Sequence, residues 1–141
     1  MEKEMPFIQQ FDTTMNLLQK VLDLRTRNQQ VISSNIANAE TPGYSASSFE
    51  FEAQLKSAMA GGELKPVAVR ENHIPLSSSN ISQVQGDIVV HPDKTGIGDK
   101  NSVSVDQEMV KLSENQILYE AAITMLNKKL AILKYVSNDG R

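Results

Sequence analysis

The chain has 141 residues and a formal charge of −3, from 14 Lys and Arg against 17 Asp and Glu. This length fits one domain, and the scattered basic residues exclude the positive surface that binds nucleic acid or an anionic membrane. Cys is absent and no apolar run could span a membrane, so we expect a soluble protein without disulfides, zinc fingers, iron–sulfur centres or thiol catalysis.

The first stretch predicts a long amphipathic helix. It opens with acidic residues and not with a solidly apolar run, so we do not expect a cleavable secretory signal. From residue 8 to 39 apolar side chains recur at alternating steps of three and four, which is typical of a heptad seam. The predicted interface residues on this seam are Ile8, Phe11, Met15, Leu18, Leu22, Ile32 and Ile36. A second apolar line (Leu17, Val21, Leu24 and Val31) lies beside it, which predicts more than one neighbour for this helix.

A turn is predicted directly after this helix. The turn residues are Thr41, Pro42, Gly43 and Tyr44. Pro42 removes a backbone donor and restricts the preceding residue to extended geometry, and Gly43 can take the positive φ of a type II turn. We expect Asn35 and Asn38 to bond to the freed carbonyls or to a neighbouring chain, and Tyr44 to pin the turn. The alternative interpretation is an ordinary helix stop.

The middle segment, residues 45–104, predicts only short elements. Ser-rich runs, Pro and Gly interrupt every apolar period there. A short helix is expected from Phe49 to Ala60, ended by the Gly pair that follows. Residues 67–69 and 88–90 are candidates for short strands.

The last stretch predicts a second long helix. Ser104 followed by Gln107 is a capping-box pattern, with acidic residues in the first turn and Lys toward the end. Its predicted interface residues are Met109, Leu112, Tyr119, Ile123, Leu126, Leu130 and Leu133. An adjoining apolar line contains Leu118, Ala122, Met125, Ile132 and Val136.

These patterns predict a mainly α fold in which two long terminal helices form a helical hairpin or coiled-coil-like pair, with a small irregular or short-β middle segment. The expected divisions are 1–44 for the first helix and its turn, 45–104 for the middle, and 105–141 for the last helix, the two ends forming one discontinuous assembly domain. Pairing would cover about one apolar line on each helix. The remaining apolar surface predicts assembly with other chains.

No residue pattern predicts catalysis, a metal or a cofactor. The two histidines, His73 and His91, lack the spacing of metal ligands, and Gly96 with Gly98 does not complete a dinucleotide fingerprint. Asp87, His91 and Asp93 could converge in a loop, but no nucleophile motif accompanies them. An enzyme would have to rest on these three residues.

Residues 34–44, SNIANAETPGY, resemble the signature of the bacterial flagellar axial proteins, the rod and hook family. Residues 101–122 resemble the family's C-terminal helix. The ending at residues 124–135, residues 73–76 and the short length resemble proximal rod proteins of the B-subunit type. Ser104 stands where Asp is frequent and keeps an N-cap, whereas Lys100 stands where Gly is frequent and leaves the preceding turn open.

The resemblance implies a structural subunit of the flagellar basal-body proximal rod, polymerising through its terminal helices to help build the drive shaft for motility, and not an enzyme. Implied partners are copies of itself, other proximal rod proteins, the inner-membrane ring with its rod adaptor protein, and the flagellar export apparatus. The implied location is the periplasmic side of the basal body, reached by type III export without signal cleavage. The alternative is a soluble helical adaptor or a secreted cargo of the export system.

Overall fold

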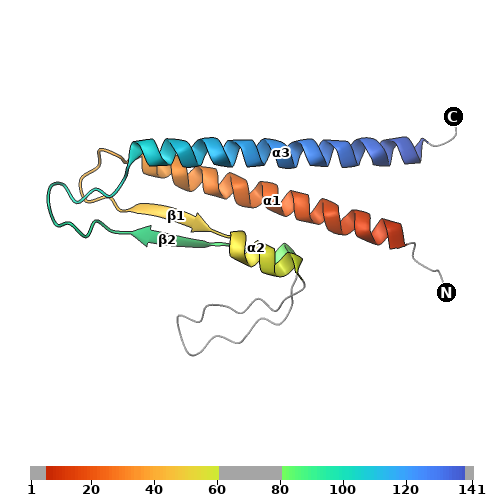
Figure 1. Cartoon of the computed structure of the whole chain (residues 1–141), viewed down its shortest axis with the longest axis horizontal. Coiled ribbons are helices and arrows are strands. Elements are labelled where there is room, and N and C mark those ends of the chain that lie inside the picture. Colours follow the sequence, from red (N-terminus) through yellow and green to blue (C-terminus); the bar gives the residue numbers. More distant parts are fainter. Residues whose placement is uncertain (1–5, 61–80, 139–141) are drawn as a thin grey trace, which may run out of the picture.

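The computed structural model describes residues 6–60 and 81–138 (Figure 1). In chain order its elements are α1 (Pro6–Ala37), β1 (Ala46–Glu50), α2 (Glu52–Met59), the short 3-10 helix η1 (Ile81–Gln83), β2 (Asp87–His91) and α3 (Val105–Ser137). The predicted fold class is confirmed, because two long terminal helices pack together and a small two-stranded sheet lies beside α1, on the side away from α3 (Figure 1). No helix in these two ranges is long and apolar enough to cross a membrane.

The two long helices pack against each other and carry the shape of the molecule. They lie close where α1 ends and α3 begins, and they separate toward the two chain ends (Figure 1). Helix α3 begins at Val105 with Ser104 at the N-cap, as predicted, but the Ser104 side chain makes no capping bond. The capping-box prediction is therefore correct for the position of the helix start and wrong for the hydrogen bond.

The middle segment forms its own small core against α1. Five residues make up this core: Leu24, Phe49, Phe51, Ala58 and Val84. Val31, also on α1, packs beside them. The second apolar line of α1, which we expected to meet another helix, is thus partly covered by the middle segment of the same chain. Because these side chains are already covered within the chain, the hydrophobic effect no longer favours a second helix against this part of α1.

The sheet pairs β1 with β2 in antiparallel register, with Ser47 opposite Val90 and Phe49 opposite Ile88. The predicted strand at 88–90 is confirmed, whereas its partner, inside the Ser-rich run, was not predicted. The short helix begins at Glu52 and not at Phe49, because Phe49 belongs to β1 and turns its ring into the core. The candidate strand at 67–69 and His73 lie outside the described residues.

The face of α3 that meets α1 differs from the predicted seam. Along α3 the buried residues are Glu108, Asn115 and Ala122, a heptad spacing that begins one residue before the predicted Met109. Three members of the predicted seam lie outside this contact, with Met109 49%, Leu130 43% and Leu133 45% exposed. The helices therefore meet through a partly polar seam, and many apolar side chains of α3 remain exposed.

On α1, Leu18 and Ile32 of the predicted interface are buried, and Met15, Leu22 and Ile36 are half-buried. On α3, Leu112, Tyr119, Ile123 and Leu126 are half-buried. Ile8 and Phe11 fall at the start of α1, where the side chains lie outside the described part of the structure.

Candidate functional site

The predicted turn after α1 is formed and is held by the loop that precedes α3. Gly43 has a φ of +75°, and the Tyr44 N–H donates to the Thr41 carbonyl at 3.2 Å, as a type II turn requires. The Gly43 N–H donates to the carbonyl of Asp99 at 2.6 Å. Asn101 donates through its amide to the carbonyls of Asn38 and Thr41, at 2.9 and 2.8 Å. The turn is therefore a fixed junction between the two halves of the chain.

Asn35 is the centre of this junction and is fully buried. Its Nδ2 donates to the Ser47 carbonyl at 2.7 Å and to Oε2 of Glu108 at 2.8 Å. Its Oδ1 accepts from the Ser47 N–H at 2.9 Å and from the Tyr44 hydroxyl at 3.2 Å. One side chain thus joins α1, the turn, β1 and α3. We predicted that Asn35 bonds to the carbonyls at the helix end or to a neighbouring chain. Both predictions are wrong, because its side chain bonds to Ser47, Glu108 and Tyr44 of the same chain.

Asn38, the second predicted asparagine, does bond to a carbonyl of the helix end. Its Nδ2 donates to the Ser34 carbonyl at 2.8 Å, and its Oδ1 accepts from the Thr41 hydroxyl at 3.2 Å. Tyr44 reaches back to α1, where its hydroxyl also lies 3.3 Å from the hydroxyl of Ser34. The predicted role of Tyr44 in pinning the turn is confirmed.

A second polar contact fixes the register of α1 on α3. Asn115 is 1% exposed, donates to the Arg25 carbonyl at 2.9 Å, and accepts from the Asn28 amide at 3.0 Å. Buried asparagine pairs in helix seams specify which residues lie opposite each other, at some cost in stability. Glu108 is also buried and pairs with Lys111 at 2.7 Å. Sequence reasoning missed Asn115 and Glu108, although a polar residue at heptad spacing within an apolar helix is a usable signal.

Many apolar side chains along α3 remain exposed in the described chain. Ile117 is 67%, Met125 57% and Ile132 51% exposed. Further exposed members are Val105, Met109, Val110, Leu118, Leu130, Leu133, Tyr135 and Val136. We call this set the α3 apolar surface. Exposed apolar surface on this scale is typical of a protein–protein contact.

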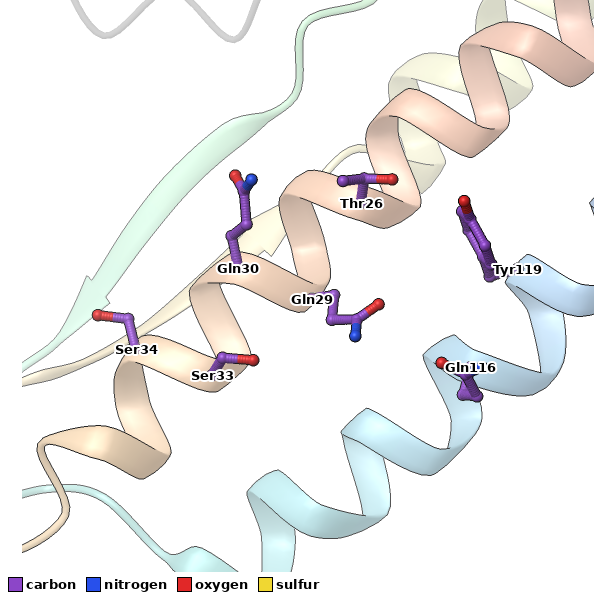
Figure 2. A pocket seen from close by; sticks show the side chains of 7 residues that line it. All are labelled: Thr26, Gln29, Gln30, Ser33, Ser34, Gln116 and Tyr119. Atoms are coloured by element: carbon purple, nitrogen blue, oxygen red, sulfur yellow. The ribbon is translucent and has the colours of Figure 1, made fainter.

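An uncharged polar groove runs between the two helices. It has a volume of about 750 Å³ and is lined by Thr26, Gln29, Gln30, Ser33, Ser34, Gln116 and Tyr119. Figure 2 shows Gln29 of α1 and Gln116 of α3 reaching into the space between the helices, with Tyr119 beside it. Amides and hydroxyls at this place can exchange hydrogen bonds with another chain without burying a charge.

The residues considered for catalysis do not form a site. Asp87 and His91 stand at opposite ends of β2, where Asp87 accepts from Gln54 at 2.6 Å and His91 lies 2.7 Å from the Ser48 hydroxyl. Asp93 accepts instead from the Thr95 N–H and hydroxyl, at 2.9 and 2.8 Å. These bonds lower the pKa of Asp93 below its ordinary value, the backbone bond most. Within the described ranges no three potential ligands gather as a metal site would need.

Comparison with known proteins identifies the family. A family model described as flagella basal body rod protein matches residues 15–44, which include most of α1 and the turn after it. The flagellar basal body rod protein FlgB of Proteus mirabilis (strain HI4320) is 30% identical over 94% of this chain and 99% of its own length. FlgB of Salmonella typhimurium (strain LT2) is 31% identical over the same shares. The chain belongs to the FlgB family of flagellar basal body rod proteins.

The match to the FlgB family extends beyond the motif at the end of α1. FlgB of Escherichia coli (strain K12) is 28% identical over 94% of this chain and 99% of that protein. The shared region therefore includes α1, the middle segment and α3. These relatives are named as rod proteins, and their names describe no catalytic activity. The predicted family is confirmed.

Proposed function

We propose that the chain is a structural subunit of the proximal rod that polymerises through its terminal helices and helps build the drive shaft for motility. The observation that carries the proposal is the α3 apolar surface, which the rest of the described chain leaves uncovered. Burial of a Leu, Ile or Met side chain yields about 1.5–3 kcal/mol, so a few such contacts suffice to hold a subunit in a lattice. No catalytic role is proposed.

Neighbouring subunits would contact both the α3 apolar surface and the polar groove. The exposed seam members Met109, Leu130 and Leu133 contribute to the first, and Tyr119 to the second. The two surfaces are different parts of the chain, so a contact of one with the other is heterologous, and it repeats without end when the rotation between neighbours does not close a ring. Such contacts generate a helical filament. The divisions 1–44, 45–104 and 105–141 then act as one assembly unit, held together at the turn.

The proposed partners are further copies of the chain, other proximal rod proteins, the inner-membrane ring with its rod adaptor, and the export apparatus. Membership of the FlgB family and the exposed α3 apolar surface support this assignment. The proposed site is the periplasmic part of the basal body, reached by type III export without cleavage of a signal.

The test is a double variant, Leu118→Asp with Met125→Asp, introduced in the bacterium that carries the protein. Both side chains are largely exposed, at 45% and 57%, so the isolated fold should keep its helix content and unfolding midpoint. Each carboxylate would cost several kcal/mol if buried in an assembly, so motility and rod formation should be lost. Asn127→Asp adds one carboxylate at another exposed position of α3, in place of a polar side chain, and this variant should swim normally.

Normal swimming of the double variant would overturn the proposal. It would favour the alternative of a soluble adaptor or export cargo, which binds one partner and needs only one seam. His91→Ala tests the catalytic alternative. If the proposal is correct, this variant should assemble the rod and swim normally; loss of swimming with an intact rod would favour a catalytic function.

A further inference from the structure

The outer edge of β2 is unpaired in the described structure. Both main-chain groups of Ser47 bond to the Asn35 side chain, so they point away from β2 and the Ser47–Val90 pair is not hydrogen-bonded. Pairs alternate along an antiparallel ladder, so Phe49 and Ile88 form the next pair of this kind. The N–H and C=O groups of Ile88 and Val90 therefore point away from β1, and no described residue bonds to them.

The same two residues expose apolar side chains beside this edge. Residues opposite each other in an antiparallel sheet share a face, so Ile88 lies on the side of the buried Phe49, which faces α1. Helix α1 packs against β1, however, and leaves β2 largely uncovered. Ile88 is 61% and Val90 56% exposed. Figure 1 shows β2 on the far side of β1 from both long helices.

The two edges of the sheet differ in their hydrogen-bond partners. The β1 edge is occupied by the Asn35 amide, which bonds to both main-chain groups of Ser47. Between the strands, the Ser102 hydroxyl bridges the Ala46 N–H and the carbonyl of its partner His91, at 2.8 and 2.6 Å. The β2 edge carries neither a lysine nor an internal proline, the usual protections of a free edge. A two-stranded sheet gains most from an added strand here.

We propose that two copies of the free subunit pair β2 with β2 and form a four-stranded sheet. The strand Asp87–His91 is complementary to itself when reversed about Val89: Ile88 faces Val90 of the second copy, and the acid Asp87 faces the imidazole of His91. In this register the outward N–H and C=O groups are the ones that meet. Ile88 and Val90 of each copy exchange hydrogen bonds, and Val89 meets Val89 in a pair without them.

The symmetry of this pairing also covers the exposed apolar side chains. The two-fold axis is perpendicular to the sheet, so both α1 helices lie on the same face. The two β1 strands are three strand spacings apart, about 14 Å, and each helix is about 10–12 Å across. Ile88 and Val90 of both copies would therefore lie in a narrow trough between the two helices. The α3 apolar surface takes no part in this contact.

This contact is isologous and closes after two copies, so it belongs to the subunit before it enters a filament. It is independent of the proposed assembly surface. The chain has no Cys, which makes single-cysteine cross-linking of the full-length protein a direct test.

Val89→Cys should form a disulfide-linked dimer on mild oxidation. Its partner Cα in the second copy would lie about 4.5 Å away, inside the disulfide range. Ile88→Cys is the register control, because its own copy in the partner lies on a diagonal about 8–9 Å away, too far for a disulfide. Light scattering on the unmodified chain should give twice 15.6 kDa at high concentration. Val90→Lys should return the mass to that of a monomer.

Three results would overturn the proposal: a monomeric mass at every concentration, equal cross-linking at positions 88 and 89, or a dimer that survives Val90→Lys. A dimer removed by Leu118→Asp with Met125→Asp would be formed by α3 and would also contradict it. None of these results bears on whether the α3 apolar surface builds the rod, which is decided by motility.

Discussion

Replacement of Asn35 should expose how far a single buried amide holds the molecule together. Its four hydrogen bonds reach Ser47, Tyr44 and Glu108, which lie in β1, in the turn and in α3. Alanine at this position would leave one oxygen of the Glu108 carboxylate without its donor in a site that is 3% exposed. The other oxygen keeps Lys111, and the Tyr44 hydroxyl keeps Ser34 nearby.

The expected loss is about 3–5 kcal/mol for Asn35→Ala. The charged acceptor accounts for about 1.5–3 kcal/mol, and the two main-chain groups of Ser47 for about 1 kcal/mol each, since Ser47 is only half-buried. A small domain has a free energy of unfolding of about 5–15 kcal/mol, so this loss is a large part of the whole. Asn38→Ala is the matched control. It should cost about 0.5–1.5 kcal/mol, because the Ser34 carbonyl also accepts the Asn38 backbone N–H.

Asn35→Asp separates hydrogen bonding from packing. The substitution keeps the size of the side chain but sets a carboxylate where Nδ2 now lies 2.8 Å from Glu108 and 2.7 Å from the Ser47 carbonyl. At neutral pH it should be less stable than Asn35→Ala, and part of the loss should return in acid, when one carboxyl takes up a proton. Urea unfolding followed by circular dichroism measures all three variants. If Asn35→Asp matches the unsubstituted chain within about 0.5 kcal/mol, the polar junction does not stabilise the fold as argued.

Four further substitutions test local features of the middle segment. Gly86→Ala should lower the free energy of unfolding in urea by about 2–4 kcal/mol, because its Cβ would lie 2.5 Å from the Phe49 ring. Gly96→Ala is the control: it has a similar φ but nothing within 4 Å, so it should cost about 1–2 kcal/mol. Equal losses for the two variants would contradict the steric clash with Phe49. Lys100 has a φ of +58°, so Lys100→Gly should gain up to about 1 kcal/mol, and a loss would refute the strain. Thr95→Val removes the hydroxyl bond to Asp93 and should raise the lowered pKa of that carboxyl toward 3.8 in an NMR titration. In the unsubstituted chain the stabilisation from the Asp93 carboxylate is present above pH 3.8 and is lost as the pH falls through its lowered pKa in the folded state.

The features that could be predicted from the sequence depend on neighbouring residues. The turn at Pro42 and Gly43, the start of α3 after Ser104 and the strand around Val89 follow from local chemistry and short apolar patterns. Lys100 illustrates a partial success. Because the family often has Gly at this position, the conformation of the turn could not be predicted, and Lys100 does adopt the positive φ that favours Gly. The family could be predicted because its motif lies within one continuous segment.

The features that could not be predicted depend on contacts between distant residues. Leu24 is covered by Phe49 and Val84, and nothing in the pattern of α1 indicates that the middle segment supplies its second neighbour. The register of α3 on α1 is set by Asn115 and Glu108, which an apolar pattern passes over. As a result, three side chains of the predicted α3 seam, Met109, Leu130 and Leu133, are exposed.

The proposed assembly is tested most directly by electron cryo-microscopy of basal bodies isolated from the bacterium that carries this chain, with the subunit located in the density. We expect α1 and α3 of each copy in the wall of the proximal rod, with Ile117, Leu118 and Met125 against neighbouring subunits. A rod that lacks this chain, or one in which these three side chains face water, would contradict the proposal.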